Sequence, residues 1–409
     1  MKRYNPNESM GEIRSRPSAD KNDSAEQSQR ERREAKSSNK FGRPVVLKSK
    51  IAAACVNPLS SSSSIFIAES AGSVRRVNVD DKDFKHVVYR GPSAPITCVA
   101  VGGAQDRTLL AGSWDRNVWS WDIETRQLGR KFVGHSDFVK AVTCTKISGK
   151  HVLISGGADK KIMVWDMATG SRLHVLQDSV TAMLAVQSLA VDPIQSSGDE
   201  AVVVSAGSDP FVRRWRVRLD RWEQLVDAEP GAPNVERRSI KVHETGVYKV
   251  LFNLSDDEAD LWTASADGSS KCLSRGKGFG LEDSFEHGDH VRSVVVTDQW
   301  VITAGRDEDL KIWDRASGKL YCSLEGHYDE VTDLVLLDGD HGQEKRLASV
   351  SIDGTVRTWP LDKAGIDTAV KEQQRAGING AVDDQPKEEP EKMLTAEEEA
   401  ELAELLDDD

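Results

Sequence analysis

The segment Ser155-Gly-Gly-Ala-Asp-Lys-Lys-Ile-Met-Val-Trp-Asp166 decides the fold, because its central pattern recurs along the chain. A tight turn carries Asp159, and Trp165 follows six positions later. The same spacing occurs at Asp115…Trp121, Asp209…Trp215, Asp307…Trp313 and Asp353…Trp359. Two further copies keep the spacing but lack the Trp: Asp267…Leu273 and Ala71…Val77. From Val77 to Trp359 the copies end 44, 44, 50, 58, 40 and 46 residues apart, which predicts a radial array of seven similar β-sheets.

The unit that ends its pattern at Trp165, the third in order, shows how each sheet is expected to form. Residues 139–144, 151–155, 161–165 and 172–176 are short β-rich runs, and residues 156–159 form the turn between the second run and the third. Short strands separated by regular turns indicate an antiparallel all-β architecture, and four strands per repeat make one propeller blade.

Three of the units share further residues beyond the Asp and the Trp. These sets are Gly134-His135, Ser155, Asp159 and Trp165; His287, Thr303, Asp307 and Trp313; and Gly326-His327, Ser349, Asp353 and Trp359. They resemble the WD40-repeat family, and the match covers about three-quarters of the chain. The resemblance implies a closed seven-bladed β-propeller, in which each His, Ser or Thr, Asp and Trp set forms a structural hydrogen-bond network within its blade.

The ring must also close, since an open sheet edge exposes unpaired backbone groups. The last repeat stops at its third strand, residues 355–359, and an orphan β-rich run at residues 43–48 precedes the first repeat. We therefore expect an N-terminal strand to complete the last blade.

The chain divides into three regions by composition. Residues 1–42 form a polar arm that is expected to be disordered, residues 43–361 form the propeller, and residues 362–409 form an acidic, mostly disordered tail with a short helix near 395–406. The tail holds 16 Asp and Glu against 5 Lys and Arg, so most of the chain's net charge of −13 belongs to it. A capping-box pattern, Thr395 with Glu398, marks the helix start. The tail helix either docks in a basic groove or keeps the protein soluble, and both roles stay open.

The sequence offers no catalytic, cofactor or metal site. Its five cysteines form no CxxC pair, which favours buried thiols in a reducing compartment. His287 and His290 are the only close histidine pair, and His287 already belongs to a blade network. No phosphate-binding glycine loop, signal peptide or membrane span is predicted, so we expect an intracellular protein, cytoplasmic and/or nuclear.

Partner-binding candidates are residues that the repeat does not require. In the family that this chain resembles, partners dock on the loops before each inner strand and on the residue before each turn Asp. Those positions hold Trp114, Phe138, Lys140, Gln187, Tyr248, His290, Arg292 and Arg306. Aromatic residues and Arg carry much of the energy of protein interfaces. The insertion at residues 219–238 is equally compatible with a docking loop and a passive loop.

A non-catalytic scaffold or adaptor within a multiprotein complex is the function that these features favour. The alternatives are a subunit of an RNA-processing or ribosome-assembly complex and a substrate receptor of a ubiquitin ligase. Direct binding of nucleic acid is disfavoured, because residues 43–361 carry a net charge of about −5 and a nucleic-acid binder is usually basic. We therefore expect the partners to be other proteins, and we expect no membrane among them.

Overall fold

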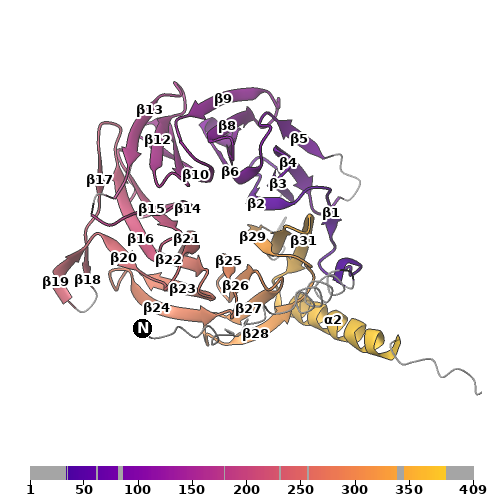
Figure 1. Ribbon diagram of the computed structural model, residues 1–409. Coiled ribbons are helices and arrows are strands. Elements are labelled where there is room, and N and C mark those ends of the chain that lie inside the picture. The colour runs from indigo at the N-terminus through magenta and orange to yellow at the C-terminus, as the bar shows by residue number, and fades with distance from the viewer. Residues whose placement is uncertain are drawn as a thin grey trace, which may run out of the picture.

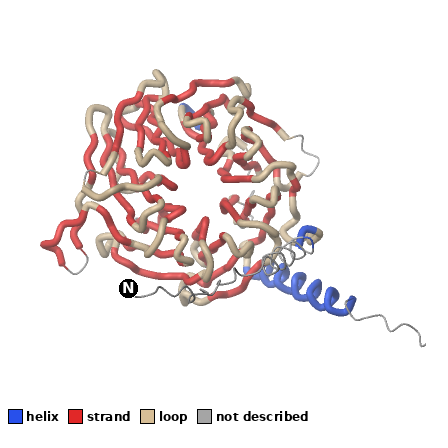
Figure 2. The backbone as a smooth tube through the Cα atoms, viewed as in Figure 1, coloured by secondary structure: helices blue, strands red, loops and turns tan. Residues whose placement is uncertain are grey.

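The computed structural model describes residues 34, 36–60, 63–81, 86–178, 180–229, 232–255, 258–338 and 345–383. In these ranges the chain is a seven-bladed β-propeller, with the blades standing in a ring around a central axis (Figure 1). Figure 2 shows that strands dominate every blade and that loops connect them. None of the helices in these ranges is both long and apolar enough to cross a bilayer.

Blades one to three each contain four antiparallel strands in sequence order from the axis outward. Blade one consists of β2 (Ile51–Val56), β3 (Ser64–Glu69), β4 (Ser73–Asn78) and β5 (Val87–Arg90). Blade two consists of β6 (Ile96–Gly102), β7 (Thr108–Ser113), β8 (Asn117–Asp122) and β9 (Leu128–Val133), with the 3-10 turn η1 (Ala104–Asp106) after β6. Blade three consists of β10 (Val139–Ile147), β11 (Lys150–Gly157), β12 (Ile162–Asp166) and β13 (Arg172–Leu176).

Blade four departs from this plan. Its strands are β14 (Val186–Val191), β15 (Ala201–Gly207), β16 (Phe211–Val217) and β17 (Trp222–Gln224), and β20 (Ser239–Lys241) also pairs with β16. Between β17 and β20 the insertion forms a two-stranded hairpin, β18 (Asp227–Glu229) and β19 (Ala232–Arg237). The hairpin projects outward from the ring, at the left of Figure 1. The insertion therefore extends from the outer rim of the ring.

Blades five to seven return to four strands each. Blade five consists of β21 (Val247–Ser255), β22 (Glu258–Ser265), β23 (Ser269–Ser274) and β24 (Gly280–Glu286). Blade six consists of β25 (Val291–Val296), β26 (Trp300–Gly305), β27 (Leu310–Asp314) and β28 (Leu320–Leu324). Blade seven consists of β29 (Val331–Leu337), β30 (Arg346–Ser351), β31 (Thr355–Pro360) and the N-terminal strand β1 (Val45–Val46).

The N-terminal strand closes the ring in the way that the orphan run predicts. Val45 pairs with Val356 and Val46 with Thr355 in antiparallel register. The backbone N–H of Leu47 adds a hydrogen bond of 2.8 Å to the carbonyl of Gly354. Blade seven therefore joins the two ends of the propeller.

Apolar side chains pack between neighbouring blades, so the core is a ring of clusters and not one central mass. One cluster joins Phe66 and Tyr89 of blade one to Leu109 and Trp121 of blade two. Burial of such aromatic and aliphatic side chains contributes roughly 1.5–3 kcal/mol each. Each blade is thus held mainly by its two neighbours, which fixes the loops on the faces of the ring.

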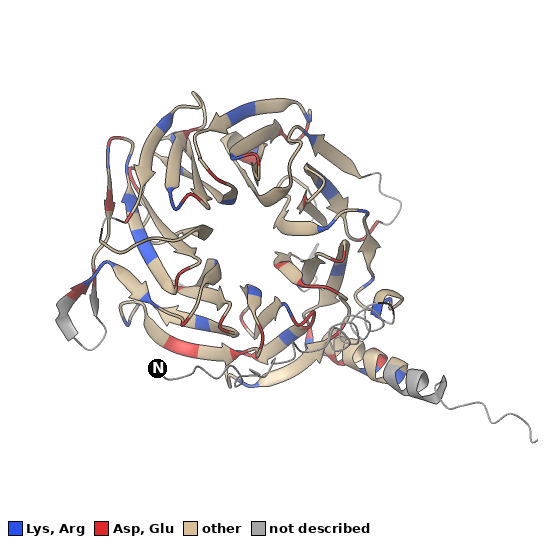
Figure 3. Cartoon of the chain, viewed as in Figure 1, with Lys and Arg blue, Asp and Glu red and all other residues tan. Residues whose placement is uncertain are grey.

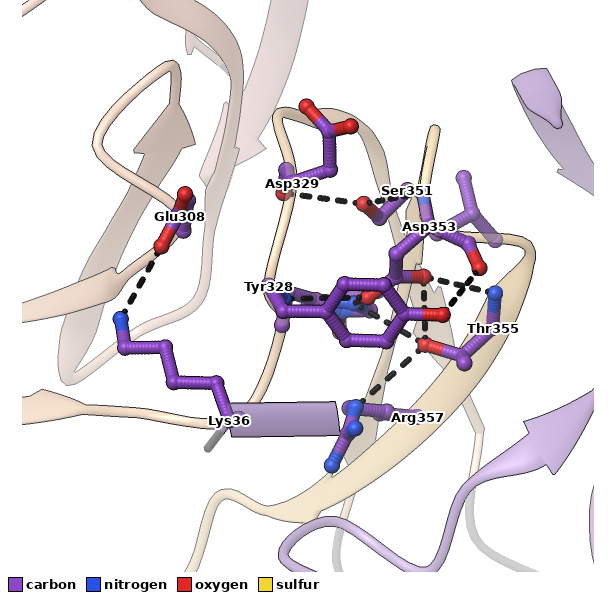
Figure 4. A network of polar contacts seen from close by, with 12 residues as sticks. Lys36, Glu308, Tyr328, Asp329, Ser351, Asp353, Thr355 and Arg357 are labelled. Carbon is purple, nitrogen blue, oxygen red and sulfur yellow. Dashed lines mark hydrogen bonds and ion pairs between the residues drawn. The ribbon is translucent and has the colours of Figure 1, made fainter. Parts of the chain in front are cut away.

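The N-terminal boundary of the ordered chain differs from the one expected from composition. Residues 36–42 were assigned to a disordered arm, but they lie against blades six and seven (Figure 4). The Lys36 ammonium lies 3.1 Å from the Glu308 carboxylate, and the Asn39 side chain donates to the carbonyl of Gly326 at 2.9 Å. The Phe41 ring packs on an apolar cluster of the two blades. Only a few residues make these contacts, so the polar average composition of residues 1–42 gives no indication of them.

Arg357 links this arm to the interior of blade seven. It is 1% exposed, and its guanidinium donates to the Asn39 side chain at 2.7 Å, to the Phe41 carbonyl and to Thr355 Oγ1. Tyr328 covers the same region and donates its hydroxyl proton to the carbonyl of Asp353 at 2.9 Å (Figure 4). A buried guanidinium needs such partners, so residues 39–41 are part of the folded blade.

The C-terminal boundary also differs, because the helix α2 (Lys363–Asp383) occupies part of residues 362–409, the tail that is expected to be mostly disordered with a short helix near 395–406. Ile366 of this helix is fully buried, and Ala369 and Val370 pack beside it on the apolar cluster of blades six and seven. Gln373 accepts a hydrogen bond from the N–H of Glu325 at 3.1 Å and donates to its carbonyl at 2.8 Å. The remainder of α2 points away from the ring (Figure 1). The arm residues 1–33 and the expected helix near 395–406 lie outside the described residues.

Candidate functional site: the upper face and central cavity

The upper face of the ring is the face that carries the Asp turns. In each blade the first strand begins at this face, since Val139 at the start of β10 pairs with Gly157 at the end of β11, directly before the turn at Asp159. The loops before the first strands and the residues beside the turn Asp therefore meet at one face. All eight partner-binding candidates belong to these loops and strand starts.

Hydrogen bonds join the members of the three complete His sets. His135 contacts Asp159 at 3.0 Å and Ser155 Oγ at 2.8 Å, and the Trp165 indole N–H donates to the same Ser155 at 2.9 Å. The sets of His287 and His327 repeat this chain of contacts through Thr303 to Trp313 and through Ser349 to Trp359. Each hydroxyl is thus held between a His and a Trp.

Burial and hydrogen bonding shape the protonation of these sets. Burial lowers the pKa of His327, and this outweighs the Asp353 carboxylate that raises it. Burial alone would raise the pKa of Asp353, but the hydrogen bond and charge of His327 lower it. A buried hydroxyl that is fixed between two side chains inside a blade has no access to a substrate, and the sets hold the turns of the upper face in place.

Blades two and four stabilise their turns differently. In blade four the fully buried Trp215 still donates to Ser205 at 2.8 Å, and the buried Arg213 contacts the turn residue Asp209, which no His of the described residues contacts there. Its guanidinium donates to Asp178 at 2.8 Å and to Asp209 at 3.0 Å. In blade two the Trp119 indole donates to the turn residue Asp115 at 2.8 Å. The Arg213 pairing was not anticipated, because Asp178 belongs to a separate loop whose position only the fold reveals.

A cavity of about 620 Å³ lies on the axis of the ring, between the inner strands. The candidates Trp114, Lys140, Gln187, Tyr248 and Arg292 line it, together with small and aliphatic residues of β2, β6 and β14. Its polar lining residues come from blades one to seven, so no single repeat contains the site. Charged residues of both signs occur all around the ring (Figure 3).

The remaining candidates join the cavity through its lining residues. The Phe138 ring stacks on Trp114, with centroids 4.8 Å apart and planes inclined by 13°. The His290 ring lies 6.5 Å from Tyr248, and the N–H of Arg306 donates to the His290 carbonyl at 3.0 Å. The structure therefore brings all eight positions to the upper face. Arg306 is exposed there and does not line the cavity.

The cations of the cavity differ in how they are neutralised. The Arg292 guanidinium lies 4.3 Å from the Tyr248 ring centroid and 3.2 Å from the Glu330 carboxylate. Lys140 lies with its ammonium 3.5 Å from the Gln187 side-chain oxygen. Burial, followed by repulsion from Arg292, lowers the pKa of Lys140.

Lys249 and Asp333 are cavity residues that the sequence did not single out. Asp333 is 5% exposed and accepts from the Lys249 ammonium at 2.8 Å, from the Ser293 hydroxyl at 2.9 Å and from the N–H of Ala54 at 3.2 Å. This carboxylate therefore ties the inner strands of blades one, five, six and seven together. The signal that could have found it is a charged residue in an otherwise apolar inner strand, Val331 to Leu337.

No metal-binding geometry stands out at this face. In the ranges that the structure describes, no three His, Cys, Asp or Glu side chains are grouped so that they could hold a metal ion. The five cysteines are all free, and burial raises the pKa of Cys98 to about 11 and that of Cys144 to about 12.

Comparison with known families gives two matches. The family model described as WD domain, G-beta repeat, matches residues 84–122, 281–314 and 318–360. The model described as tRNA methyltransferase TRM82 WD40 domain matches residues 130–220, which cover blade three and the first three strands of blade four.

Curated relatives and solved structures agree with this assignment of repeats. An uncharacterized WD repeat-containing protein of Schizosaccharomyces pombe is 29% identical over 389 residues, which cover 92% of this chain and 95% of that protein. A p21-activated protein kinase-interacting protein 1-like protein of Xenopus laevis is 24% identical, over 70% of this chain and 69% of that protein. The crystal structure of the WD40 β-propeller domain of Doa1 superposes with a TM-score of 0.61 at 16% identity, covering 79% of this chain and 97% of that one.

Proposed function

Since this chain is a WD40-repeat protein that folds as a seven-bladed β-propeller, we propose that it is a non-catalytic adaptor that docks a protein partner on its upper face within a multiprotein complex. The observation that carries the proposal is the exposed stack of Trp114 on Phe138 beside the cavity. Their side chains are 48% and 37% exposed, and neither belongs to a blade network. A rigid, exposed aromatic pair provides the kind of anchor on which interface energy concentrates.

The rest of the face supports the same function. Arg292, held by Tyr248 and Glu330, and the exposed Arg306 can pair with acidic groups of a partner. Because the strands of separate blades hold these groups, one partner surface can contact several of them without reordering them. Such preorganisation lowers the entropy cost of binding.

The test is affinity purification of the tagged full-length chain, followed by identification of the recovered proteins. We expect Trp114→Ala combined with Arg306→Ala to remove at least one partner while the melting temperature falls by no more than about 6 °C, the limit set by loss of one aromatic pair. Leu128→Ala is the matched control, because Leu128 is also an exposed apolar residue of blade two and is 54% exposed. Equal partner recovery from all the proteins would contradict the proposal.

A second candidate is a non-catalytic subunit of an RNA-processing complex, and the match of residues 130–220 to the tRNA methyltransferase domain favours it. In this case the partner carries the chemistry and the RNA contact. The arginines of β16 and the adjacent Arg218 support an indirect role, since Arg213 and Arg214 are buried and Arg216 and Arg218 pair with Glu223 and Glu200. The test is whether the recovered partner is an RNA-modifying enzyme, and whether the chain alone lacks salt-sensitive RNA binding.

The cysteines bear on the cellular location that we propose for the adaptor. Free cysteines without disulfides are typical of a reducing compartment, so we place the protein inside the cell.

A further inference from the structure

The lining of the central cavity is cationic, although the chain as a whole is acidic. Four of the described lining residues are Lys or Arg and one, Asp333, is a carboxylate, whereas the whole chain carries a net charge of −13. The four cations come from blades one, three, five and six, so the ring gathers them around its axis. A hollow that is lined by charge of one sign raises the local concentration of the opposite charge. The cavity therefore favours an anionic group.

Three of these four cations need no further counter-ion. The Lys249 ammonium lies 2.8 Å from the Asp333 carboxylate, and the Arg292 guanidinium lies 3.2 Å from the Glu330 carboxylate. Lys50 is exposed at the edge of the cavity, where water solvates its charge. The fourth cation is therefore the one that an incoming anion meets without competition.

Lys140 is this fourth cation, and it is half-buried. Within the described ranges no carboxylate forms an ion pair with its ammonium, which donates one long hydrogen bond of 3.5 Å to the Gln187 side-chain oxygen. The Gln187 amide is itself fixed, because its nitrogen donates to Ser208 Oγ at 3.0 Å. An ammonium has three N–H donors, so donors remain for a ligand. A half-buried charge without a counter-ion gains more from an ion pair than a fully solvated one.

An apolar anchor lies directly beside this cation. Trp114 lines the same cavity, and the Phe138 ring, two residues before Lys140 in the sequence, stacks on Trp114 with centroids 4.8 Å apart. The backbone at both rings is fixed, because the Trp114 N–H donates to the Pro95 carbonyl at 3.0 Å and the Ala158 N–H donates to the Phe138 carbonyl at 2.8 Å. A ligand thus meets a cation and an aromatic pair whose positions are set before it binds.

We propose that the partner of this adaptor inserts an Asp or Glu side chain of an exposed peptide segment into the cavity, where its carboxylate pairs with Lys140. A neighbouring apolar or aromatic side chain of the same segment packs on the Trp114 and Phe138 rings. This inference rests on the proposed function and names the kind of partner that the upper face fits. Affinity then has two separable parts, one from the ion pair and one from the rings.

The charge balance favours a carboxylate over a phosphate group. A phosphorylated side chain carries roughly −1.5 to −2 charges at neutral pH. In this cavity only the Lys140 charge is both half-buried and without a paired carboxylate in the described residues. The Asp137 carboxylate, on the loop before β10, acts electrostatically on Lys140 and repels a second negative charge at the same place. A single carboxylate matches this balance, and a dianion exceeds it.

Selection of random short peptides displayed on phage, with the full-length protein immobilised, tests the proposal before the partner is identified. We expect the enriched peptides to carry Asp or Glu within a few positions of Trp, Phe or Leu. The enriched sequence, labelled, is then the probe in fluorescence anisotropy. Lys140→Gln weakens its binding about tenfold or more, and so does replacement of the peptide's acidic residue by its amide. Combining the two changes costs little more than either alone, because each removes the same ion pair.

Two further variants separate the parts of the site. Trp114→Ala also weakens binding about tenfold but leaves the effect of the peptide's acidic residue intact. Lys160→Gln is the matched control, because Lys160 is an exposed cation at the upper face of the same blade, directly after the turn residue Asp159, and does not line the cavity. It removes the same charge as Lys140→Gln, so unchanged affinity assigns the effect to the cavity.

A charge exchange decides the matter if a thermal melt shows that Lys140→Gln disturbs the fold. Lys140→Glu loses the acidic peptide and binds a peptide in which Lys replaces the acidic residue. A misfolded variant binds neither peptide, so this gain shows that the two side chains meet.

Enriched peptides without acidic residues overturn the proposal, as does an acidic peptide whose affinity is independent of Lys140. Tighter, Lys140-dependent binding of the same peptide with phosphoserine at the acidic position assigns the cavity to phosphate and overturns the carboxylate form. The adaptor proposal fails separately. If the peptide binds as expected but no partner depends on Trp114 and Arg306, the anion site stands without the adaptor. If a partner depends on both residues and excess peptide does not displace it, the adaptor stands and the acidic segment is refuted.

Discussion

The Trp114 indole stacks on the Phe138 ring across the boundary between blades two and three, with the planes inclined by only 13°. Each ring comes from a loop whose ends are fixed by strands, and neither ring is enclosed by the core. We expect Phe138→Ala to lower the free energy of unfolding by no more than about 1.5 kcal/mol, since aromatic pairs contribute roughly 0.5–1.5 kcal/mol. Urea denaturation measures this. A loss above about 3 kcal/mol would assign the stack to the core.

Closure of the ring predicts a large effect for a small deletion. Removing residues 43–49 takes away β1 and leaves the outer edge of β31 unpaired. We expect the melting temperature to fall by more than about 5 °C, because each lost kcal/mol shifts it by roughly 2–4 °C in a domain of this size. Val46→Thr is the control, since the Val46 side chain is 71% exposed and the backbone pairing survives. An unchanged melting curve after the deletion would refute closure by β1.

Ser349 holds two buried partners at once, so its hydroxyl is worth more than an ordinary surface contact. Ser349→Ala leaves the Trp359 indole N–H and a His327 ring nitrogen without their partner. We expect a loss of about 1–3 kcal/mol in the free energy of unfolding. Ser284→Ala, at an exposed Ser of blade five, should stay within roughly 0.5 kcal/mol of the wild type. Similar losses in the free energy of unfolding for Ser349→Ala and Ser284→Ala would contradict this prediction.

His327 makes stability depend on pH below neutrality. Burial lowers its pKa below the ordinary value of 6.5, so the unfolded chain binds a proton more readily than the folded chain. The stabilisation is complete above pH 6.5 and is lost as the pH falls from there through the lower pKa of the folded state. Guanidinium denaturation at pH 7.5 and pH 5.5 should show a decline of at most about 1.4 kcal/mol per pH unit from this group. His327→Gln should reduce that decline, and an unaltered pH dependence in the variant would argue against this residue.

The thiols should be nearly inert in the folded protein. Burial raises the pKa of Cys98 to about 11 and that of Cys272 to about 12, so little thiolate is present at pH 8. We expect a disulfide reagent to modify them at least tenfold more slowly in buffer than in guanidinium. Rapid modification of all five cysteines under native conditions would show that the blades open readily.

The repeats could be predicted from sequence because their evidence is local and redundant. Asp159 and Trp165 lie on one turn and one strand, and five copies of this spacing leave little freedom in the register. The closure by Val45 and Val46 could also be inferred, because a blade with three strands requires a fourth. The family resemblance further indicated which loops meet at one face.

Contacts between distant segments could not be found in this way. Ile366, Ala369 and Val370 form a short apolar stripe in a polar stretch, and this stripe becomes sufficient for a helix only when it packs on the apolar cluster of blades six and seven. Arg213 contacts Asp178, which lies 35 residues earlier in the sequence, and only the fold brings the two side chains together. The cavity could not be predicted from the sequence for the same reason, because its lining residues, such as Lys140 and Asp333, belong to different blades.

The pairing of β1 with β31 also determines when the ring can close during synthesis of the chain. Val46 leaves the ribosome about 310 residues before its partner Thr355. At roughly 5–20 residues per second, the first strand therefore waits on the order of 15–60 s for the strand that it completes. During that interval six blades can collapse in order, while the ring stays open at a single seam. A chain that is interrupted before residue 355 never gains its last blade, so this one short pairing tells an intact product from a truncated one.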